Sequence, residues 1–192
     1  SDGQMCKELL KVMRKQGMEF QLQAKVTGAK IAGSKITVMF EDIASGGTKE
    51  IVCDKVLVAV GRKPYSEGLG LEELGIEKDA RGYVVINDHF QTNKFPNVYA
   101  VGDLVRGPML AHKAEEEGVA VAEIIAGQAG HVNYLTVPNV IYTWPELASV
   151  GYTEEQLKTQ GVEYNVGSFP FKANGRARAM NSTDGLVKIL AN

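Results

Sequence analysis

The chain has 192 residues, of which 44% are hydrophobic and 23% are charged, a composition that suffices for one substantial core or two small ones. Its formal net charge is only -2 and its 21 Lys and Arg residues are scattered, so it lacks the basic stripe typical of nucleic-acid binders. No run approaches the roughly 18 apolar residues of a membrane helix, and no signal-peptide pattern opens the chain. Neither a nucleic-acid partner nor a membrane is therefore expected.

The first predicted element is an amphipathic helix over residues 5–15, with Asp2 as its N-cap and Gly17 as its terminator. Three predicted strands follow as a meander separated by glycine-containing turns, at 19–26, 35–41 and 49–60. The end of the third strand, 55–60, shows no polar alternation after its first residue. This pattern is typical of a strand buried on both faces of a sheet.

In the middle of the chain, a Leu-rich stretch at 69–74 and two predicted strands at 83–86 and 98–101 lead to Gly102 and Asp103. A long helix is expected over about 110–126, and a loop over 127–133. Beyond them the sequence predicts strands around 140–142, 148–152, 165–171 and 185–190, with a short helix at 153–160. Thr153 is the expected N-cap of that helix, with Glu155 and Gln156 in its first turn.

Both ends of the sequence are typical of an internal piece of a longer protein. Ser1 and Asp2 indicate an internal cut, so a targeting segment could have preceded them. The last predicted strand, 185–190, has no following turn or partner. The C-terminal domain is therefore expected to be incomplete.

The candidate site centres on Asp103, which follows a predicted strand and a glycine. Ligands of α/β proteins bind at the carboxyl ends of strands, and a carboxylate there can accept hydrogen bonds from ribityl or ribose hydroxyls. A strand followed by Gly-Asp is a weak signal alone, because the dipeptide is a common turn. However, Pro108 precedes a helix whose first backbone N–H groups are unpaired, and such a helix start stabilises the negative charge of a reduced flavin.

The stretch VYAVGDLVRGPMLAHKAEEEG resembles the second flavin-binding motif of the pyridine nucleotide-disulfide oxidoreductase family, in its dihydrolipoamide dehydrogenase branch. The stretches VLVAVGRKPYSEGLGLEELGI and VPNVIYTWPELASVGYTEEQLK also resemble that branch, so the similarity covers effectively the whole chain. It implies an α/β chain, a fragment of the fold with two dinucleotide-binding domains, followed by the start of an α+β dimer-interface domain. The implied segments are 1–62 (C-terminal part of the NAD-binding domain), 63–132 (second FAD-binding segment and central domain) and 133–192 (N-terminal part of the interface domain).

The resemblance also implies two cofactors, FAD and NAD, and the residues that would bind them. The ribityl chain of FAD would be held by Asp103, and its isoalloxazine ring would be lined, mostly through backbone, by Met109, Leu110, Ala111 and His112. The nicotinamide cofactor would be contacted by Gly61 and Val26. Gly61 has an independent rationale, since a glycine that ends a buried strand permits close approach of another molecule. Val26 has none beyond its strand position.

No catalytic residue and no metal site is predicted within the chain. The family's redox-active CxxxxC pair, its catalytic His-Glu pair and the GxGxxG fingerprint are absent, so we expect the isolated chain to be inactive. Cys6 and Cys53 are expected to be ordinary buried or half-buried thiols. His89 and His131 are expected on the surface, and Trp144 stands where the family usually has His. The run 115–117 of three Glu is expected to form a solvated helix face, because successive residues on a helix cannot converge on one ligand.

Three functional hypotheses follow. The parent protein is a homodimeric dihydrolipoamide dehydrogenase, whose substrate is carried on the acyltransferase or H protein of a multienzyme complex. Alternatively, it is a related reductase of the mercuric or glutathione type, or the chain is a catalytically dead flavin-binding or assembly module. The resemblance implies the cytoplasm for a bacterial parent and the mitochondrial matrix for a eukaryotic one.

Overall fold

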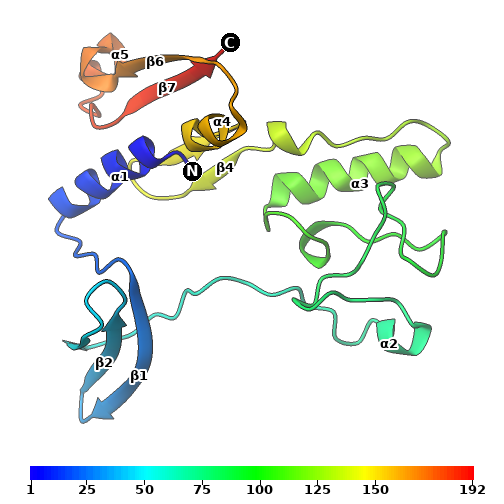
Figure 1. Ribbon diagram of the computed structural model, residues 1–192, viewed down its shortest axis with the longest axis horizontal. Coiled ribbons are helices and arrows are strands. Elements are labelled where there is room, and N and C mark those ends of the chain that lie inside the picture. The colour runs from blue at the N-terminus through cyan, green and yellow to red at the C-terminus, as the bar shows by residue number, and fades with distance from the viewer. The chain divides into compact units, whose positions relative to one another are not determined.

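The computed structural model describes residues 1–192, which form two compact units (Figure 1). The first unit combines Gly61–Tyr142 with Glu146–Val162 and includes Ser1. The second combines Asp2–Val60, Thr143–Pro145 and Glu163–Asn192. No helix in the structure has the length and apolar character needed to cross a membrane.

The second unit opens with helix α1 (Gly3–Lys15), which matches the prediction closely. The carboxylate of Asp2 caps its start by accepting from the backbone N–H groups of Gln4 at 3.0 Å and Met5 at 3.4 Å. Gly17 follows the helix with φ +92°, a conformation that favours glycine. The helix buries Val12 and Met13.

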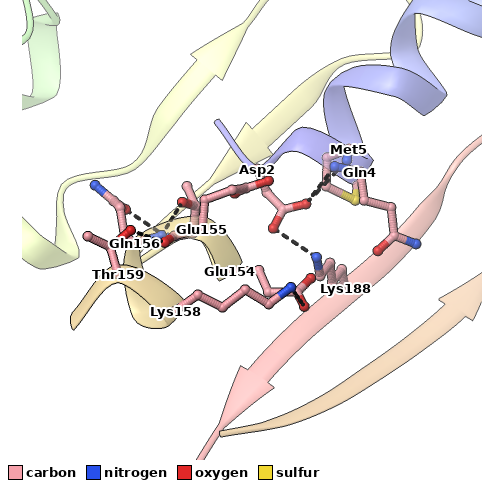
Figure 2. Close-up of polar contacts among 10 residues, drawn as sticks. Asp2, Gln4, Met5, Glu154, Glu155, Gln156, Lys158, Thr159 and Lys188 are labelled. Carbon is pink, nitrogen blue, oxygen red and sulfur yellow. Dashed lines mark hydrogen bonds and ion pairs between the residues drawn. The ribbon is translucent and has the colours of Figure 1, made fainter. Parts of the chain in front are cut away.

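Asp2 also joins the start of the chain to its end. Its second carboxylate oxygen lies 2.8 Å from the ammonium of Lys188, and both side chains are almost entirely removed from solvent. Figure 2 shows the Asp2 side chain between the first backbone N–H groups of α1 and this lysine. One carboxylate therefore caps a helix and fixes that helix to strand β7 (Leu186–Ala191).

Three antiparallel strands follow α1 in the order β1 (Ala24–Ala32), β2 (Lys35–Asp42) and β3 (Thr48–Cys53), which confirms the predicted meander. The first strand lies later in the chain than expected, because Gly28 does not end it. The β1–β2 register instead shifts between Val26 and Gly28. A Cβ added to Gly28 would lie 3.1 Å from the Met39 side chain, so the glycine permits close packing at the irregularity.

The predicted buried strand over 55–60 is wrong. The third strand ends at Cys53, and no strand of the chain pairs with the segment that follows. Its apolar side chains are exposed, with 89% of Leu57 and 93% of Val60 open to solvent. A strand buried on both faces needs a neighbour along each edge and a layer on each face, and these residues have neither.

Strands β6 (Asn165–Pro170) and β7 form an antiparallel pair in the second unit. The last strand therefore has a partner, contrary to expectation. Between the two strands lie a 3-10 turn η3 (Phe171–Ala173) and helix α5 (Gly175–Ala179), neither of which was predicted. The Asn174 side chain accepts from the Ala177 N–H at 3.0 Å and caps α5.

The first unit contains little regular sheet. Its elements are α2 (Leu71–Leu74), η1 (Gly102–Leu104), α3 (Ala111–Ile125), η2 (Tyr134–Thr136), β4 (Asn139–Ile141), β5 (Leu147–Ser149) and α4 (Glu154–Gln160). The strands predicted at 83–86 and 98–101 are reduced to isolated bridges, Lys78↔Val84, Ile86↔Thr92 and Gln91↔Tyr99. The predicted strands at 140–142 and 148–152 appear as the short pair β4–β5, one residue earlier in the chain. The loop at 127–133 is confirmed.

Two apolar clusters form the core of this unit. One is built on Ile76, Val84, Ala100 and Val105. The other is built on Phe90, Ala120, Val132 and Val137. Half-buried Ile86 packs against both. The coil that carries residues 98–101 is therefore fixed by burial rather than by a sheet.

Candidate functional site

The candidate site begins at η1, the short turn that contains Asp103. This turn packs against α3. The Asp103 side chain is 43% exposed, and its Oδ2 lies 3.5 Å from Nη2 of Arg62. The turn therefore presents a carboxylate that can accept hydrogen bonds from a ligand's hydroxyl groups.

Gly102 holds the turn close to α3. Its φ of +71° lies in the left-handed region, and a Cβ added there would come within 3.2 Å of the Ala114 Cβ. Any other residue would meet both backbone strain and a tight contact. The glycine of the predicted Gly-Asp pair is thus required by the fold as well as by the motif.

A buried polar network lies beneath this turn, and it corrects one prediction. Glu115 and Glu116 are exposed as expected, but Glu117 is fully buried, so the solvated face does not extend to it. Lys113 is also fully buried, and its ammonium lies 3.0 Å from Oε1 of Glu117. Because Lys113 and Glu117 are four residues apart, both project from the face of α3 that meets the turn.

The Lys113–Glu117 pair binds both polar backbone atoms of Gly102. The Gly102 N–H donates to Oε2 of Glu117 at 2.6 Å. The Lys113 ammonium donates to the Gly102 carbonyl at 3.0 Å. Tyr134, from η2, completes the network by donating its hydroxyl to Oε1 of Glu117 at 2.7 Å. Burial raises the pKa of the Tyr134 phenol, and the hydrogen bond that it donates to the Glu117 carboxylate raises this pKa further.

The start of α3 provides a second polar feature of the site. Its N-cap is Leu110, whose side chain makes no capping hydrogen bond, and the first turn carries no acidic residue. Leu110 is half-buried and packs against the second core cluster, while Met109 and His112 are half-buried and Ala111 is exposed. His112 does not act as a cap, because its Nε2 lies 2.8 Å from the Pro138 carbonyl. Backbone N–H groups at such a start attract negative charge.

The residues predicted to contact a nicotinamide cofactor fall in different units. Gly61, in the first unit, has φ +112° and open space around the position of a Cβ. It is exposed and does not end a buried strand. Val26, in the second unit, lies on β1 beside the register shift and is 65% exposed. Asp103 and residues 109–112 lie around η1 and α3 in the first unit, whereas Val26 belongs to the second unit.

The structure also shows the surroundings of the two cysteines and of the two remaining histidines. Cys53 is half-buried, as predicted, and its thiol donates to the Ile36 carbonyl at 3.4 Å, but Cys6 is exposed. Cys6 was expected to be buried or half-buried, and its place on the outer face of α1 explains the difference. His89 and His131 are exposed, as expected, and line a cavity of about 410 Å³. No group of three or more potential metal ligands is present.

Sequence reasoning missed Lys113, Glu117 and Tyr134. A signal for the first two was available, because Lys113, Glu117 and Ala120 follow the i, i+4, i+7 spacing of one helix face. All three are buried. Tyr134 reaches the network from η2, and no local pattern indicates that contact.

Comparison with known proteins identifies the family that the chain matches. Residues 1–118 match the pyridine nucleotide-disulphide oxidoreductase family, and residues 137–192 match the dimerisation domain of that family. The chain is 54% identical over 190 residues to mitochondrial dihydrolipoyl dehydrogenase of Bos taurus and of Homo sapiens. Each alignment covers 98% of this chain and 37% of the relative, so the chain spans little more than a third of these proteins.

Two solved structures are similar over nearly the whole chain. The HOCl-induced flavoprotein disulfide reductase RclA of Escherichia coli has a TM-score of 0.86 and 27% identity, with 99% of this chain and 42% of that one covered. LpdA of Mycobacterium tuberculosis has a TM-score of 0.84 and 25% identity, with 98% and 40% covered. The α/β fold class with a dimerisation domain, expected from sequence, is thereby confirmed.

Proposed function

Because the chain belongs to the pyridine nucleotide-disulphide oxidoreductase family, we propose that the whole protein is an FAD-dependent dihydrolipoamide dehydrogenase that reduces NAD+ to NADH. The observation that carries the proposal is the arrangement around η1. A half-exposed carboxylate stands on a fixed turn, and the turn packs against a helix whose first turn has no side-chain cap.

These residues fit one half of a flavin site. Asp103 supplies the acceptor for ribityl hydroxyl groups. Residues 109–112 supply the backbone N–H groups that stabilise negative charge at the isoalloxazine ring, by a helix-terminus effect of about half an elementary charge. FAD, when bound, would carry electrons from a thiol pair to the nicotinamide cofactor.

The other half of each nucleotide site would come from outside these 192 residues, because the chain has no GxGxxG sequence. For NAD we propose contacts at Gly61 and Val26. The support for Gly61 is its positive φ and the open space beside it, which permit close approach. The support for Val26 is its 65% exposure on β1.

The proposed segments are 1–62 from the NAD-binding domain, 63–132 from the second FAD-binding segment and central domain, and 133–192 from the interface domain. The match of 137–192 to a dimerisation domain supports the last of these and favours a homodimer. The proposed substrate is dihydrolipoamide on the acyltransferase or H protein of a multienzyme complex. The proposed compartment is the mitochondrial matrix or, in a bacterium, the cytoplasm, and the matched relatives are named as mitochondrial.

Another disulfide reductase of the same family is the second candidate, since RclA shares the fold at a TM-score of 0.86. Its 27% identity is half the 54% identity to the dihydrolipoyl dehydrogenases, which favours the first candidate. A catalytically dead assembly module remains the proposal for the 192-residue polypeptide alone. Its two thiols, Cys6 on α1 and Cys53 on β3, form no CxxxxC pair.

The test uses the purified whole protein and the 192-residue polypeptide in parallel. We expect flavin absorption that survives desalting, together with lipoamide-dependent turnover of NADH, from the whole protein only. Asp103→Ala should weaken flavin retention in the whole protein, whereas Asp88→Ala, a change at an exposed carboxylate away from η1, should not. Turnover by the short polypeptide, or flavin retention unaffected by Asp103→Ala, would contradict the proposal.

A further inference from the structure

The buried network beneath η1 has no direct part in the proposed function, because Lys113 and Glu117 are fully buried and cannot touch a ligand. We propose that Lys113, Glu117 and Tyr134 are positioning residues that hold Asp103 in the orientation needed to bind the flavin. This inference rests on the proposed function, since it names residues that act on the same site.

The network fixes the two peptide groups that flank Gly102. The Gly102 N–H, bound by Glu117, belongs to the peptide group before it. The Gly102 carbonyl, bound by Lys113, belongs to the peptide group that leads into Asp103. A glycine at φ +71° has no side chain to resist rotation, so these two bonds set the direction in which the Asp103 carboxylate leaves the turn.

The same helix supplies both parts of the candidate site. Helix α3 presents the uncapped backbone N–H groups at its start, and the pair that holds Gly102 consists of Lys113 in its first turn and Glu117 one turn later. The position of the η1 turn relative to the helix start is therefore set by side chains of the helix itself. A change that loosens the network should move Asp103 while leaving the helix start in place.

The chemistry of the network is better suited to orienting the η1 turn than to merely holding the turn against α3. Burying two charges is costly, and a well-packed apolar pair would hold the helix at least as well. Charge-assisted hydrogen bonds differ from apolar contacts in demanding a defined geometry. Every partner of the Glu117 carboxylate is a donor, namely the Lys113 ammonium, the Tyr134 hydroxyl and the Gly102 N–H.

The test measures the Kd of the apo form of the whole protein for FAD, by flavin fluorescence. Glu117→Gln brings an amide NH2 group among three donors, so we expect FAD to bind about tenfold more weakly, as for the loss of one charge-assisted bond. Glu116→Gln removes the same charge from the exposed neighbour and should leave the Kd unchanged. Equal Kd values for the two variants would overturn the inference.

A double-mutant cycle with Asp103→Ala separates positioning from general stability. If Glu117 acts through Asp103, then Glu117→Gln should weaken FAD binding less than about twofold once the Asp103 carboxylate is gone. A full effect in the Asp103→Ala background would show that Glu117 supports the fold and not the carboxylate, and would overturn the inference.

If Glu117→Gln fails to fold, the double change Lys113→Met with Glu117→Gln takes its place in the cycle. This change leaves no unpaired buried charge. The same coupling to Asp103 is expected, and additive effects would again overturn the inference. An unmodified whole protein that takes up no FAD would instead refute the proposed function itself, and the two failures are thus distinguishable.

Discussion

At the scale of single residues, Gly102 is required both by the fold and by the candidate site. Gly102→Ala would place a side chain at φ +71° and 3.2 Å from the Ala114 Cβ. We expect the free energy of unfolding to fall by about 1–3 kcal/mol, because alanine is strained in this region. Chemical denaturation of the whole protein measures the change.

Gly118→Ala is the matched control for this substitution. Gly118 lies inside α3, and a Cβ added there would meet nothing within 4 Å. Alanine is the better helix former, so this change should leave stability unaltered or raise it by about 0.5–1 kcal/mol. Similar losses at the two positions would show that the Gly102 turn is not strained in the way the geometry indicates.

The raised pKa of Tyr134 makes the stability of the folded protein depend on pH. Because burial raises the pKa of its phenol above the ordinary 10.0, the folded protein keeps this proton at pH values where the unfolded chain loses it. The stabilisation linked to this proton is therefore complete below about pH 10 and is lost as the pH rises above it. Ultraviolet titration should show a late-titrating tyrosine that Tyr134→Phe removes, and a titration curve unchanged by Tyr134→Phe would contradict the assignment.

At the scale of elements, local signals predicted the three longest helices, α1, α3 and α4, well, but missed α5. The capping box of α4 is an example, since Thr153 Oγ1 accepts from the Gln156 N–H at 3.3 Å and the Gln156 side chain accepts from the Thr153 N–H at 2.8 Å. Both partners lie within four residues, so the sequence alone identifies them. The strands were predicted less accurately. Gly28, for example, is typical of a turn in the sequence, but in the structure it lies within β1 and permits close packing against Met39.

The α4 cap makes a measurable contribution. Thr153→Ala removes one of the two capping bonds and should lower the free energy of unfolding by about 1 kcal/mol. Thr159→Ala is the control within the same helix, since its hydroxyl donates to the Glu155 carbonyl and caps nothing. It should be neutral or slightly stabilising, because alanine favours helix more than threonine does. Equal effects of the two changes would mean that the capping box does not hold α4.

At the scale of the whole molecule, the sequence indicated a candidate site but not the buried network beneath it. Asp103 and residues 109–112 could be proposed from the sequence because their motif is contiguous. Glu117 was assigned to solvent, because three successive glutamates look alike until the partner face of α3 is known. Tyr134 joins the network from a separate turn, a contact that only the tertiary structure supplies.

The segment over 55–60 shows the same dependence on distant partners. Its apolar run is typical of a central parallel strand, yet Leu57 is 89% exposed and Val60 93% exposed in the 192-residue chain. The chain spans 37% of the length of its dihydrolipoyl dehydrogenase relatives, and we expect the missing neighbours of this segment to lie in the whole protein.

Hydrogen exchange tests this expectation directly. In the 192-residue polypeptide, the amides over 55–60 should exchange as fast as those of an unstructured chain, because no strand pairs with this segment. In the whole protein the same amides should be protected by pairing with strands that these residues do not contain. Strand β2, paired on both edges, serves as the internal reference and should be protected in both proteins. Protection of 55–60 in the short polypeptide would mean that its apolar run finds a partner within these 192 residues, whereas fast exchange in the whole protein would mean that the run is not a central strand at all.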